Sequence, residues 1–110
     1  MDIDTQVLKG HIDTIILSLL CKQDMYGYDI ANAVRKRSHG KFEIKEGTMY
    51  LSLKRMEKNE LIESYWGGTE GGGARRKYYR ILESGQRFYR YKKREWSYLK
   101  SVLDTFLEEG

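Results

Sequence analysis

Cationic side chains are concentrated in one part of this 110-residue chain. Residues 75–94 contain nine lysine and arginine residues but a single acidic residue, whereas the rest of the chain is mildly acidic and the net charge is +4. Such a block suits the binding of a polyanion such as a nucleic acid. Its densest part is the run Arg75, Arg76 and Lys77, which we expect to contact phosphates. The alternatives are a solvated helix face and protection of a strand edge by charge.

A second set of polar side chains lies on a predicted helix over residues 46–59. Sequence readout of DNA requires groups on a helix face that reach base edges. The outer face of this helix is rich in hydroxyl and basic groups, and Thr48, Ser52 and Arg55 share one of its flanks. A solvated face is again the alternative. The candidates for contact with bases or phosphates are Lys45, Thr48, Tyr50 and Lys54.

Enzyme chemistry has little support in the sequence. Two histidines and one cysteine do not form any zinc-binding pattern of usual spacing. The glycine-rich run over residues 67–74 is not followed by Gly-Lys-Ser/Thr, and it leads into a strand rather than a helix, so it is not a phosphate-binding loop. We therefore expect no catalytic residues, no metal and no cofactor.

Hydrophobic periodicity predicts the elements that position these residues. Apolar residues at helical spacing predict four helices, and two segments of period two predict a hairpin around the glycine-rich loop. Asp24 is the expected N-cap of the second helix, and Gly40 is expected to end it. Met49, Leu53 and Met56 form the core stripe of the third helix. The predicted helices cover residues 5–22, 26–38, 46–59 and 83–108, and the strands cover residues 61–66 and 76–81.

The last predicted helix carries an apolar seam. Trp96, Leu99, Leu103 and Phe106 alternate at spacings of three and four, which is typical of a coiled coil. Within a chain this short, such a helix has no partner for its whole length, so we expect it to pack against a second copy. The residues expected at this dimer interface are Leu8, Tyr89, Trp96, Leu99, Leu103 and Phe106.

Cellular location follows from what the sequence lacks. The longest apolar run is too short to span a membrane, and the acidic start of the chain does not resemble a signal peptide. Cys21 cannot form an intrachain disulfide, and its place in an apolar helix predicts a buried, structural thiol. We expect a cytoplasmic protein without membrane contact.

The order of elements is that of a winged helix: three helices, a hairpin and a further helix. In that α+β, mostly helical fold, the third helix enters the major groove of DNA and the hairpin, or wing, lies against the backbone. Both sets of candidate residues fall on these elements. The expected organisation is a winged helix-turn-helix unit over residues 1–82, followed by a dimerisation helix over residues 83–110. Residues 5–22 are expected to join the dimer interface.

A series of short motifs resembles the PadR family of transcriptional regulators over residues 7–107. Their order and spacing carry the resemblance more than any single motif. The motifs are Leu8-Lys9-Gly10, Tyr26-Gly27-Tyr28-Asp29-Ile30, Glu46-Gly47-Thr48-Met49-Tyr50, Leu53-Lys54-Arg55-Met56-Glu57, Lys58-Asn59-Glu60-Leu61-Ile62, Arg75-Arg76-Lys77-Tyr78-Tyr79-Arg80-Ile81 and Glu83-Ser84-Gly85.

The resemblance implies a homodimer that binds a palindromic promoter site in double-stranded DNA, usually as a repressor. The short C-terminus resembles the small subfamily with one C-terminal helix, some members of which release DNA when aromatic or drug-like compounds bind. In drug-sensing relatives a tryptophan of the last helix faces its twin beside the ligand, and Trp96 stands at a matching place. Val7, His11 and Thr14 lie on one side of the first predicted helix, so they are expected to line the same cavity.

The chain also departs from the family pattern. Lys45-Glu46 stands where members commonly have Ser-Pro, and Leu51 stands where they have proline. Glu46 favours the positive end of the helix dipole, so we expect the helix to form. Lys92 and Lys93 make one end of the expected cavity more cationic than an apolar drug pocket would be, which leaves room for an anionic aromatic ligand.

These observations lead to one main hypothesis and two rivals. The main hypothesis is a dimeric regulator, a repressor released by a small aromatic effector. The first rival is an architectural or RNA-binding protein without an effector, which would bind nucleic acid with strong salt dependence and no preferred site. The second is a protein-interaction module whose basic helix docks on an acidic partner.

Overall fold

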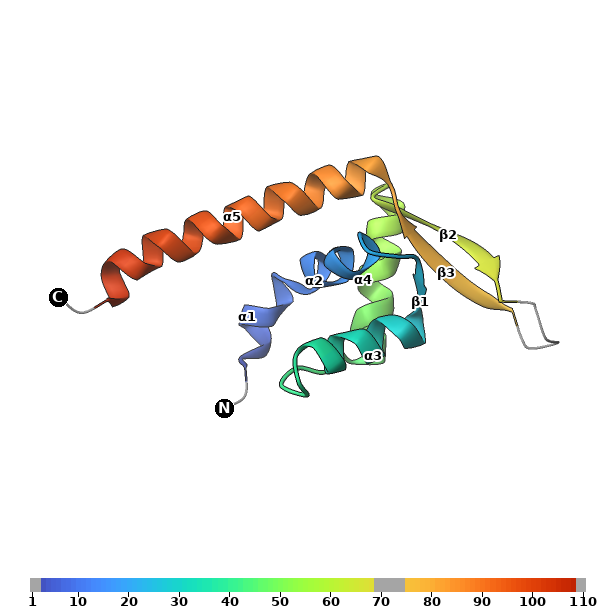
Figure 1. Ribbon diagram of the computed structural model, residues 1–110, viewed down its shortest axis with the longest axis horizontal. Helices are drawn as coiled ribbons and strands as arrows, with labels where there is room; N and C mark the ends of the chain where they lie inside the picture. Colours follow the sequence, from blue (N-terminus) through green and yellow to red (C-terminus); the bar gives the residue numbers. More distant parts are fainter. Residues whose placement is uncertain (1–2, 69–74, 109–110) are drawn as a thin grey trace.

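The helices and the hairpin of this chain enclose one small core, from which the last helix extends. The computed structural model describes residues 3–68 and 75–108, and these measure 62 × 31 × 21 Å overall (Figure 1). Five helices and three strands lie within those residues. In chain order they are α1 (Thr5–Lys9), α2 (Ile12–Leu20), β1 (Met25–Tyr26), α3 (Gly27–Arg37), α4 (Glu46–Lys58), β2 (Ile62–Gly67), β3 (Arg76–Ile81) and α5 (Glu83–Leu107).

The prediction of a single helix over residues 5–22 is wrong, because two helices occupy this segment. Gly10 has the weakest helix propensity there, and the chain turns at this residue. The His11 N–H donates to the Leu8 carbonyl at 2.8 Å, which closes the turn, and the His11 carbonyl accepts from Ile15 at 2.9 Å, which begins α2. As a result, α1 is set at an angle to α2 (Figure 1).

The start of α3 also differs from the prediction. Asp24 is not its N-cap, because Met25 and Tyr26 form β1 and pair with Tyr79 and Tyr78 of β3. The Asp24 carboxylate instead accepts a hydrogen bond of 2.6 Å from the Tyr65 hydroxyl. The backbone of Met25 and Tyr26 finds its partners in β3, and α3 begins without a side-chain cap.

The end of α3 agrees with the prediction that Gly40 stops this helix. The Gly40 N–H donates to the Arg35 carbonyl at 2.8 Å, and the His39 N–H donates to Lys36 at 3.1 Å. His39 and Gly40 both have positive φ, of 55° and 76°. This is the Schellman arrangement, in which left-handed residues turn the chain back on the last carbonyls.

The helix α4 and the hairpin match the prediction closely. Met49, Leu53 and Met56 are buried, as the core stripe requires. β2 and β3 pair antiparallel from Ile62 opposite Ile81 to Gly67 opposite Arg76, and β3 lies between β1 and β2. The predicted loop of residues 67–74 falls largely on residues 69–74, which lie outside the described residues. The predicted fold, a winged helix-turn-helix with a further helix, is confirmed.

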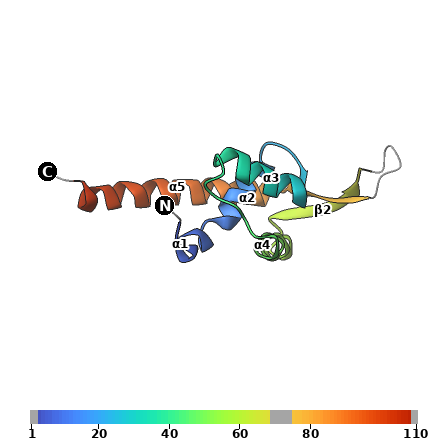
Figure 2. The same ribbon diagram turned by 90° about the horizontal axis from the view of Figure 1, so that it is seen from below.

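The core lies between α2, α3, α4 and the sheet. The side chains of Ile16, Leu17, Ile30 and Leu53 have no exposed surface, and Tyr79 is the buried member of the pair Tyr78-Tyr79. α2 contacts α3, α4, β3 and α5, so it is the central element. Figure 2 shows that α4 lies at one edge of the molecule, while the hairpin projects from one end.

The first turns of α5 pack on the core, whereas its C-terminal half extends beyond it (Figure 1). A Cβ on Gly85 would lie 2.1 Å from the Leu61 carbonyl oxygen, so only glycine allows this close docking. The seam residues Trp96, Leu99, Leu103 and Phe106 are 48, 44, 42 and 79% exposed. Among the described residues, none of the helices is long and apolar enough to cross a membrane.

The expectation of a buried Cys21 is wrong. This residue follows the last turn of α2, and its side chain is exposed. The apolar run ends one residue earlier, at Leu20, because the chain leaves the core there. Local desolvation raises the pKa of the Cys21 thiol, and the charge of Arg90 opposes that rise.

Candidate nucleic-acid interface and adjoining pocket

The face of α4 that points away from the core is defined by its buried residues. Met49, Ser52, Leu53 and Met56 face inward. At 3.6 residues per turn, the positions opposite them are those of Gly47, Leu51, Lys54 and Lys58. Lys54 is therefore a predicted site residue near the middle of the outer face, while Thr48 and Lys45 are exposed toward one flank. Our sequence analysis missed Leu51 and Lys58, which the helical period alone places opposite the core stripe.

The side chain of Tyr50 does not point straight outward from α4, as a side chain that contacts bases would. Its side chain is 43% exposed, but its hydroxyl oxygen lies 2.2 Å from the position that a Cβ on Gly27 would take. The phenol therefore points toward the start of α3. Burial raises the pKa of the neighbouring Tyr79, and the nearby Glu57 and Tyr50 add to that rise. Tyr50 thus joins α3 to α4 and presents part of its ring to solvent.

One flank of α4 is tied to α2. Ser52, expected on the exposed flank, is instead buried, and its hydroxyl donates to Asp13. Arg55 also binds Asp13, with 2.5 Å between its Nη2 and Oδ1 and 3.3 Å between its Nε and Oδ2. The Asp13 carboxylate satisfies the buried hydroxyl and neutralises Arg55, so this network fixes α4 rather than offering free cations.

The cations of the wing, the hairpin of β2 and β3, lie over aromatic rings. The guanidinium of Arg76 is 5.0 Å from the ring centroid of Tyr26, and that of Arg75 is 5.8 Å from Trp66. The ammonium of Lys77 lies 5.7 Å from the ring of Tyr79. Cation–π contacts orient a cation without neutralising it. All three predicted cations are exposed, so their charge is available to a polyanion.

The aromatic rings form a row across the outer face of the sheet. The ring of Tyr78 lies 5.5 Å from that of Tyr26 and 5.6 Å from that of Tyr65. Hydrogen bonds to Glu63 raise the pKa of Arg80, and the hydrogen bond that Tyr65 donates to Asp24 raises the pKa of this phenol. These side-chain bonds tie β2 to β3 and to the residue before β1, so the row is held in place beneath Arg76 and Arg80, whose guanidinium groups lie over Tyr26 and Tyr65.

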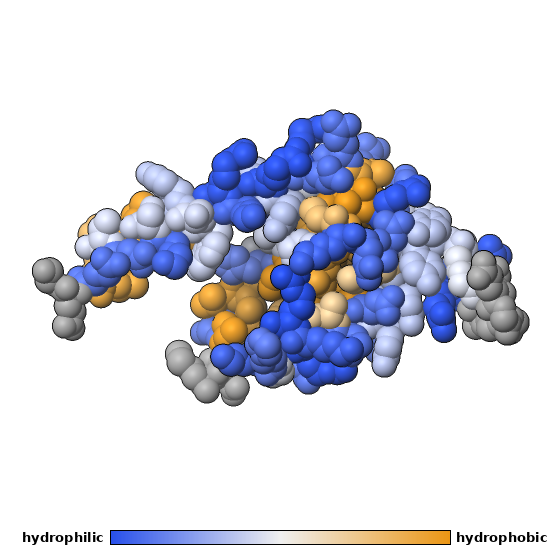
Figure 3. Space-filling model, in the orientation of Figure 1, coloured by the Kyte–Doolittle hydropathy of each residue, from blue (hydrophilic) through white to orange (hydrophobic). Residues whose placement is uncertain are grey.

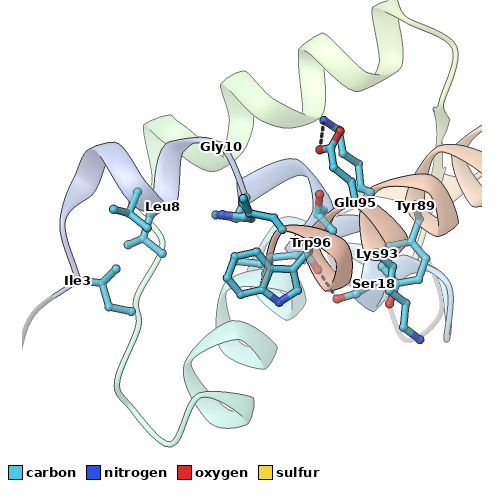
Figure 4. A pocket seen from close by; sticks show the side chains of 14 residues that line it. Ile3, Leu8, Gly10, Ser18, Tyr89, Lys93, Glu95 and Trp96 are labelled. Carbon is cyan, nitrogen blue, oxygen red and sulfur yellow. Dashed lines mark hydrogen bonds and ion pairs between the residues drawn. The ribbon is translucent and has the colours of Figure 1, made fainter. Parts of the chain in front are cut away.

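The four predicted effector residues line one hollow of about 490 Å³ between α1, α2 and α5. His11 meets Trp96 edge to face, with ring centroids 5.2 Å apart and an interplanar angle of 79°. Figure 4 shows the Trp96 ring between Ile3 and Leu8 on one side and Tyr89 and Ser18 on the other. The four predicted residues are Val7, His11, Thr14 and Trp96.

The hollow is mainly apolar and continues into the seam. Leu8, Tyr89 and Leu99, which were predicted at the dimer interface, also line it. Lys92 lies at its edge in an ion pair of 3.1 Å with Glu95, so part of the expected cationic character is neutralised. Figure 3 shows hydrophobic surface on α1 and at the C-terminal end of α5, on either side of a notch.

Metal chemistry finds no support in the geometry. Within residues 3–68 and 75–108, no group of three histidine, cysteine, aspartate or glutamate side chains is placed to hold a metal ion. Several of the ionisable groups described above bind each other or stand over aromatic rings, while Lys45, Lys54 and Lys58 are exposed.

Comparison with known proteins identifies a family of regulators. The model of the transcriptional regulator PadR-like family matches residues 16–91. A transcriptional regulator from Clostridium thermocellum is 42% identical, with a TM-score of 0.88 over 96% of this chain and 99% of that one. A PadR family transcription regulator from Clostridium difficile is 47% identical, with a TM-score of 0.76 over 89% and 99%. A PadR-like regulator from Bacillus cereus is 30% identical, with a TM-score of 0.82 over 96% and 100%.

Proposed function

The chain belongs to the PadR-like family of transcriptional regulators, and on this premise we propose that it acts as a homodimeric repressor released by a small aromatic effector. The family is one of DNA-binding regulators and not of enzymes. The proposal adds the second copy, the sign of regulation and the effector. One observation supports the second copy and the effector: exposed apolar residues gather on α1 and α5, apart from the exposed cations of α4 and the wing. The sign of regulation rests on the family resemblance alone.

DNA binding is assigned to α4 and the wing. Two copies of α4 would enter successive major grooves about one helical turn apart, at the halves of a palindromic site. Lys54 and Thr48 are exposed for contact with bases or phosphates, and Lys45 precedes the helix. Arg75, Arg76 and Lys77 would contact the flanking phosphates, which position the protein without reading the sequence.

Dimerisation is assigned to α5, with a contribution from α1. Leu99, Leu103 and Phe106 are apolar and at least 42% exposed in the single chain. Burial of apolar surface contributes about 25 cal/mol per Å², so a second copy packed on this seam would be stabilised. Leu8 and Tyr89 lie beside the seam in the hollow described above.

The effector is assigned to the hollow that contains Trp96. A flat aromatic molecule would stack on the indole ring and contact Val7, His11 and Thr14. Because the hollow adjoins the seam, a ligand there would change how the two copies pack, and so the spacing of the two α4 helices. Such a ligand regulates only if it binds the two arrangements with different affinity.

The first test is fluorescence anisotropy with a labelled duplex from immediately upstream of this protein's gene, beside a scrambled duplex. We expect a preference for the native duplex that persists at near-physiological salt. Arg76→Ala should weaken both duplexes about equally and flatten the salt dependence. Equal, weak and salt-sensitive binding of the wild type to both duplexes would favour an architectural protein, and the absence of binding would favour an interaction module.

Tryptophan fluorescence tests the effector site separately. Planar aromatic compounds should quench the wild type and Trp66→Leu, but not Trp96→Leu. Trp66 lies on the wing, so Trp66→Leu is a matched control for the loss of one indole. Equal quenching in all three proteins would contradict the assignment of the pocket.

A further inference from the structure

The outermost stripe of α4 contains a leucine among polar neighbours. Leu51 is 67% exposed, so folding of the chain gains little from burying it. The same stripe carries Lys54 and Lys58, three and seven residues further along the helix. An exposed apolar side chain next to exposed cations, on the helix assigned to the major groove, suits a partner that is both anionic and locally apolar.

The stripe begins at Gly47, one turn before Leu51. A Cβ on Gly47 would meet nothing within 4 Å, and its φ is not in the left-handed region. The fold therefore does not require glycine there. Its effect is to leave the first turn of α4 bare on the face that Leu51 occupies, so that another surface can approach the backbone closely.

Duplex DNA has the required combination of charge and apolar surface. In the major groove, thymine presents a C5-methyl group, and side chains such as alanine, threonine or phenylalanine read it by apolar contact. The phosphates on either side of the groove suit the lysines. We propose that Leu51 reads the methyl group of a thymine in each half of the operator, so that Leu51 determines specificity in addition to the polar candidates. This inference rests on the proposed function.

A rival role for Leu51 lies within the protein. The side chain also borders a hollow of about 380 Å³ between α1, the link before α4 and α4 itself, which Phe42 and Ile44 line as well. A second copy of the chain seated there would bury Leu51 without any contact to DNA. The charges of Lys54 and Lys58 on the same stripe favour DNA over an apolar partner.

The test removes the proposed methyl contact either from the DNA or from the protein. An operator is first selected from random duplexes, and each thymine is then replaced by deoxyuridine, which lacks only the methyl group. Wild-type affinity should fall about three- to fivefold per half-site at one symmetric position. Leu51→Ala should lose a similar factor on the thymine operator and should not respond to deoxyuridine at that position. Lys54→Ala is the matched control. It should weaken binding to the thymine and deoxyuridine operators by the same factor, so that the ratio of the two affinities stays that of the wild type.

Each outcome decides a different claim. If no duplex is selected above the random pool, the proposed function fails and the role of Leu51 fails with it. If an operator is bound but wild type and Leu51→Ala respond alike to every deoxyuridine, only the role of Leu51 is overturned. A shift of Leu51→Ala from dimer to monomer in sedimentation would assign the residue to the protein interface and would overturn it as well. Leu51→Met, which keeps an apolar side chain, should retain the response.

Discussion

The wing and the C-terminal half of α5 are both exposed. They differ in how far other residues of the same chain hold their exposed side chains in place. On the wing, Arg75 and Arg76 already stand over the rings of Trp66 and Tyr26. Along α5, Trp96 meets the ring of His11, but the seam continues into the half of the helix that extends beyond the core (Figure 1), and its members are 42–79% exposed. The cations are thus oriented within a single chain, whereas much of the apolar seam stays exposed in it and suits packing against the second copy that we propose.

Because of this difference, we expect the wing and the seam to contribute to DNA binding in different ways. A preorganised cation loses little conformational entropy when a phosphate binds, so the wing contributes to DNA affinity in each copy independently. In the proposed dimer, the seam would contribute to DNA affinity by linking two copies, which raises the effective concentration of the second α4 at its half-site. Changes to the seam should therefore affect assembly and DNA binding together, and changes to the wing should affect DNA binding alone.

The largest predicted effect follows from a charge in the seam. Leu103→Glu should convert the dimer to a monomer, because an unpaired carboxylate would be buried against the second copy. Loss of the linked half-site should then weaken operator binding by about 100-fold or more. Sedimentation velocity and anisotropy measure the two effects. Tyr98→Glu is the control, since Tyr98 lies off the seam and is 73% exposed; a dimer that survives Leu103→Glu would contradict the assignment.

The next largest effect is expected at Gly85, where α5 docks on the segment that joins α4 to β2. Gly85→Ala should destabilise the fold by about 1–3 kcal/mol, because the new Cβ would lie 2.1 Å from the Leu61 carbonyl oxygen. Gly47→Ala, where a Cβ meets nothing within 4 Å, should leave the stability unchanged or raise it by up to about 1 kcal/mol. Urea unfolding followed by circular dichroism compares the two. Equal stability of both variants would show that α5 does not dock on β2 and α4 as closely as described.

Much of this fold could be predicted from the sequence, because its long elements have strong periods. The bounds of α3, α4, β2, β3 and α5 agree with the predicted ranges to within one residue. The misses are local. β1 has two residues, which is too short for any alternation to be recognised, and the turn at Gly10 depends on one glycine in an otherwise helical pattern.

The candidate sites were predictable to different degrees. Val7, His11 and Thr14 share a side of the N-terminal segment, so their placement beside Trp96 followed from spacing and family resemblance. The helical period places Ser52 on the core face, three residues after Met49, but its partner Asp13 could not be predicted, because it lies 39 residues away in the sequence. Leu51 was missed for a different reason: a search for hydrogen-bonding groups does not consider apolar side chains.

A smaller effect tests the preorganisation of the wing. Tyr26→Leu should weaken DNA binding about two- to fivefold, because Arg76 would lose the ring that orients it. In a double-mutant cycle with Arg76→Ala, the coupling should be about 0.5–1 kcal/mol, measured by anisotropy at low salt. Tyr28→Leu is the control, since Tyr28 stacks on Tyr26 and is 67% exposed. Additive effects of Tyr26→Leu and Arg76→Ala would show that the ring does not position the cation.

The smallest predicted effect concerns one carboxylate on the wing and one on α5, which are exposed to a similar degree. Glu63 binds Arg80 on the wing, and Asp104 binds Lys100 on α5 at 3.2 Å. These carboxylates are 45 and 40% exposed, so each neutralisation should change the stability by less than about 1 kcal/mol. Glu63→Gln should raise DNA affinity up to about threefold and steepen its salt dependence, because it frees a cation beside the phosphates. Asp104→Asn removes the same charge from the apolar region and should leave both quantities unchanged. An equal gain from the two variants would mean that net charge alone, rather than its place on the wing, governs binding.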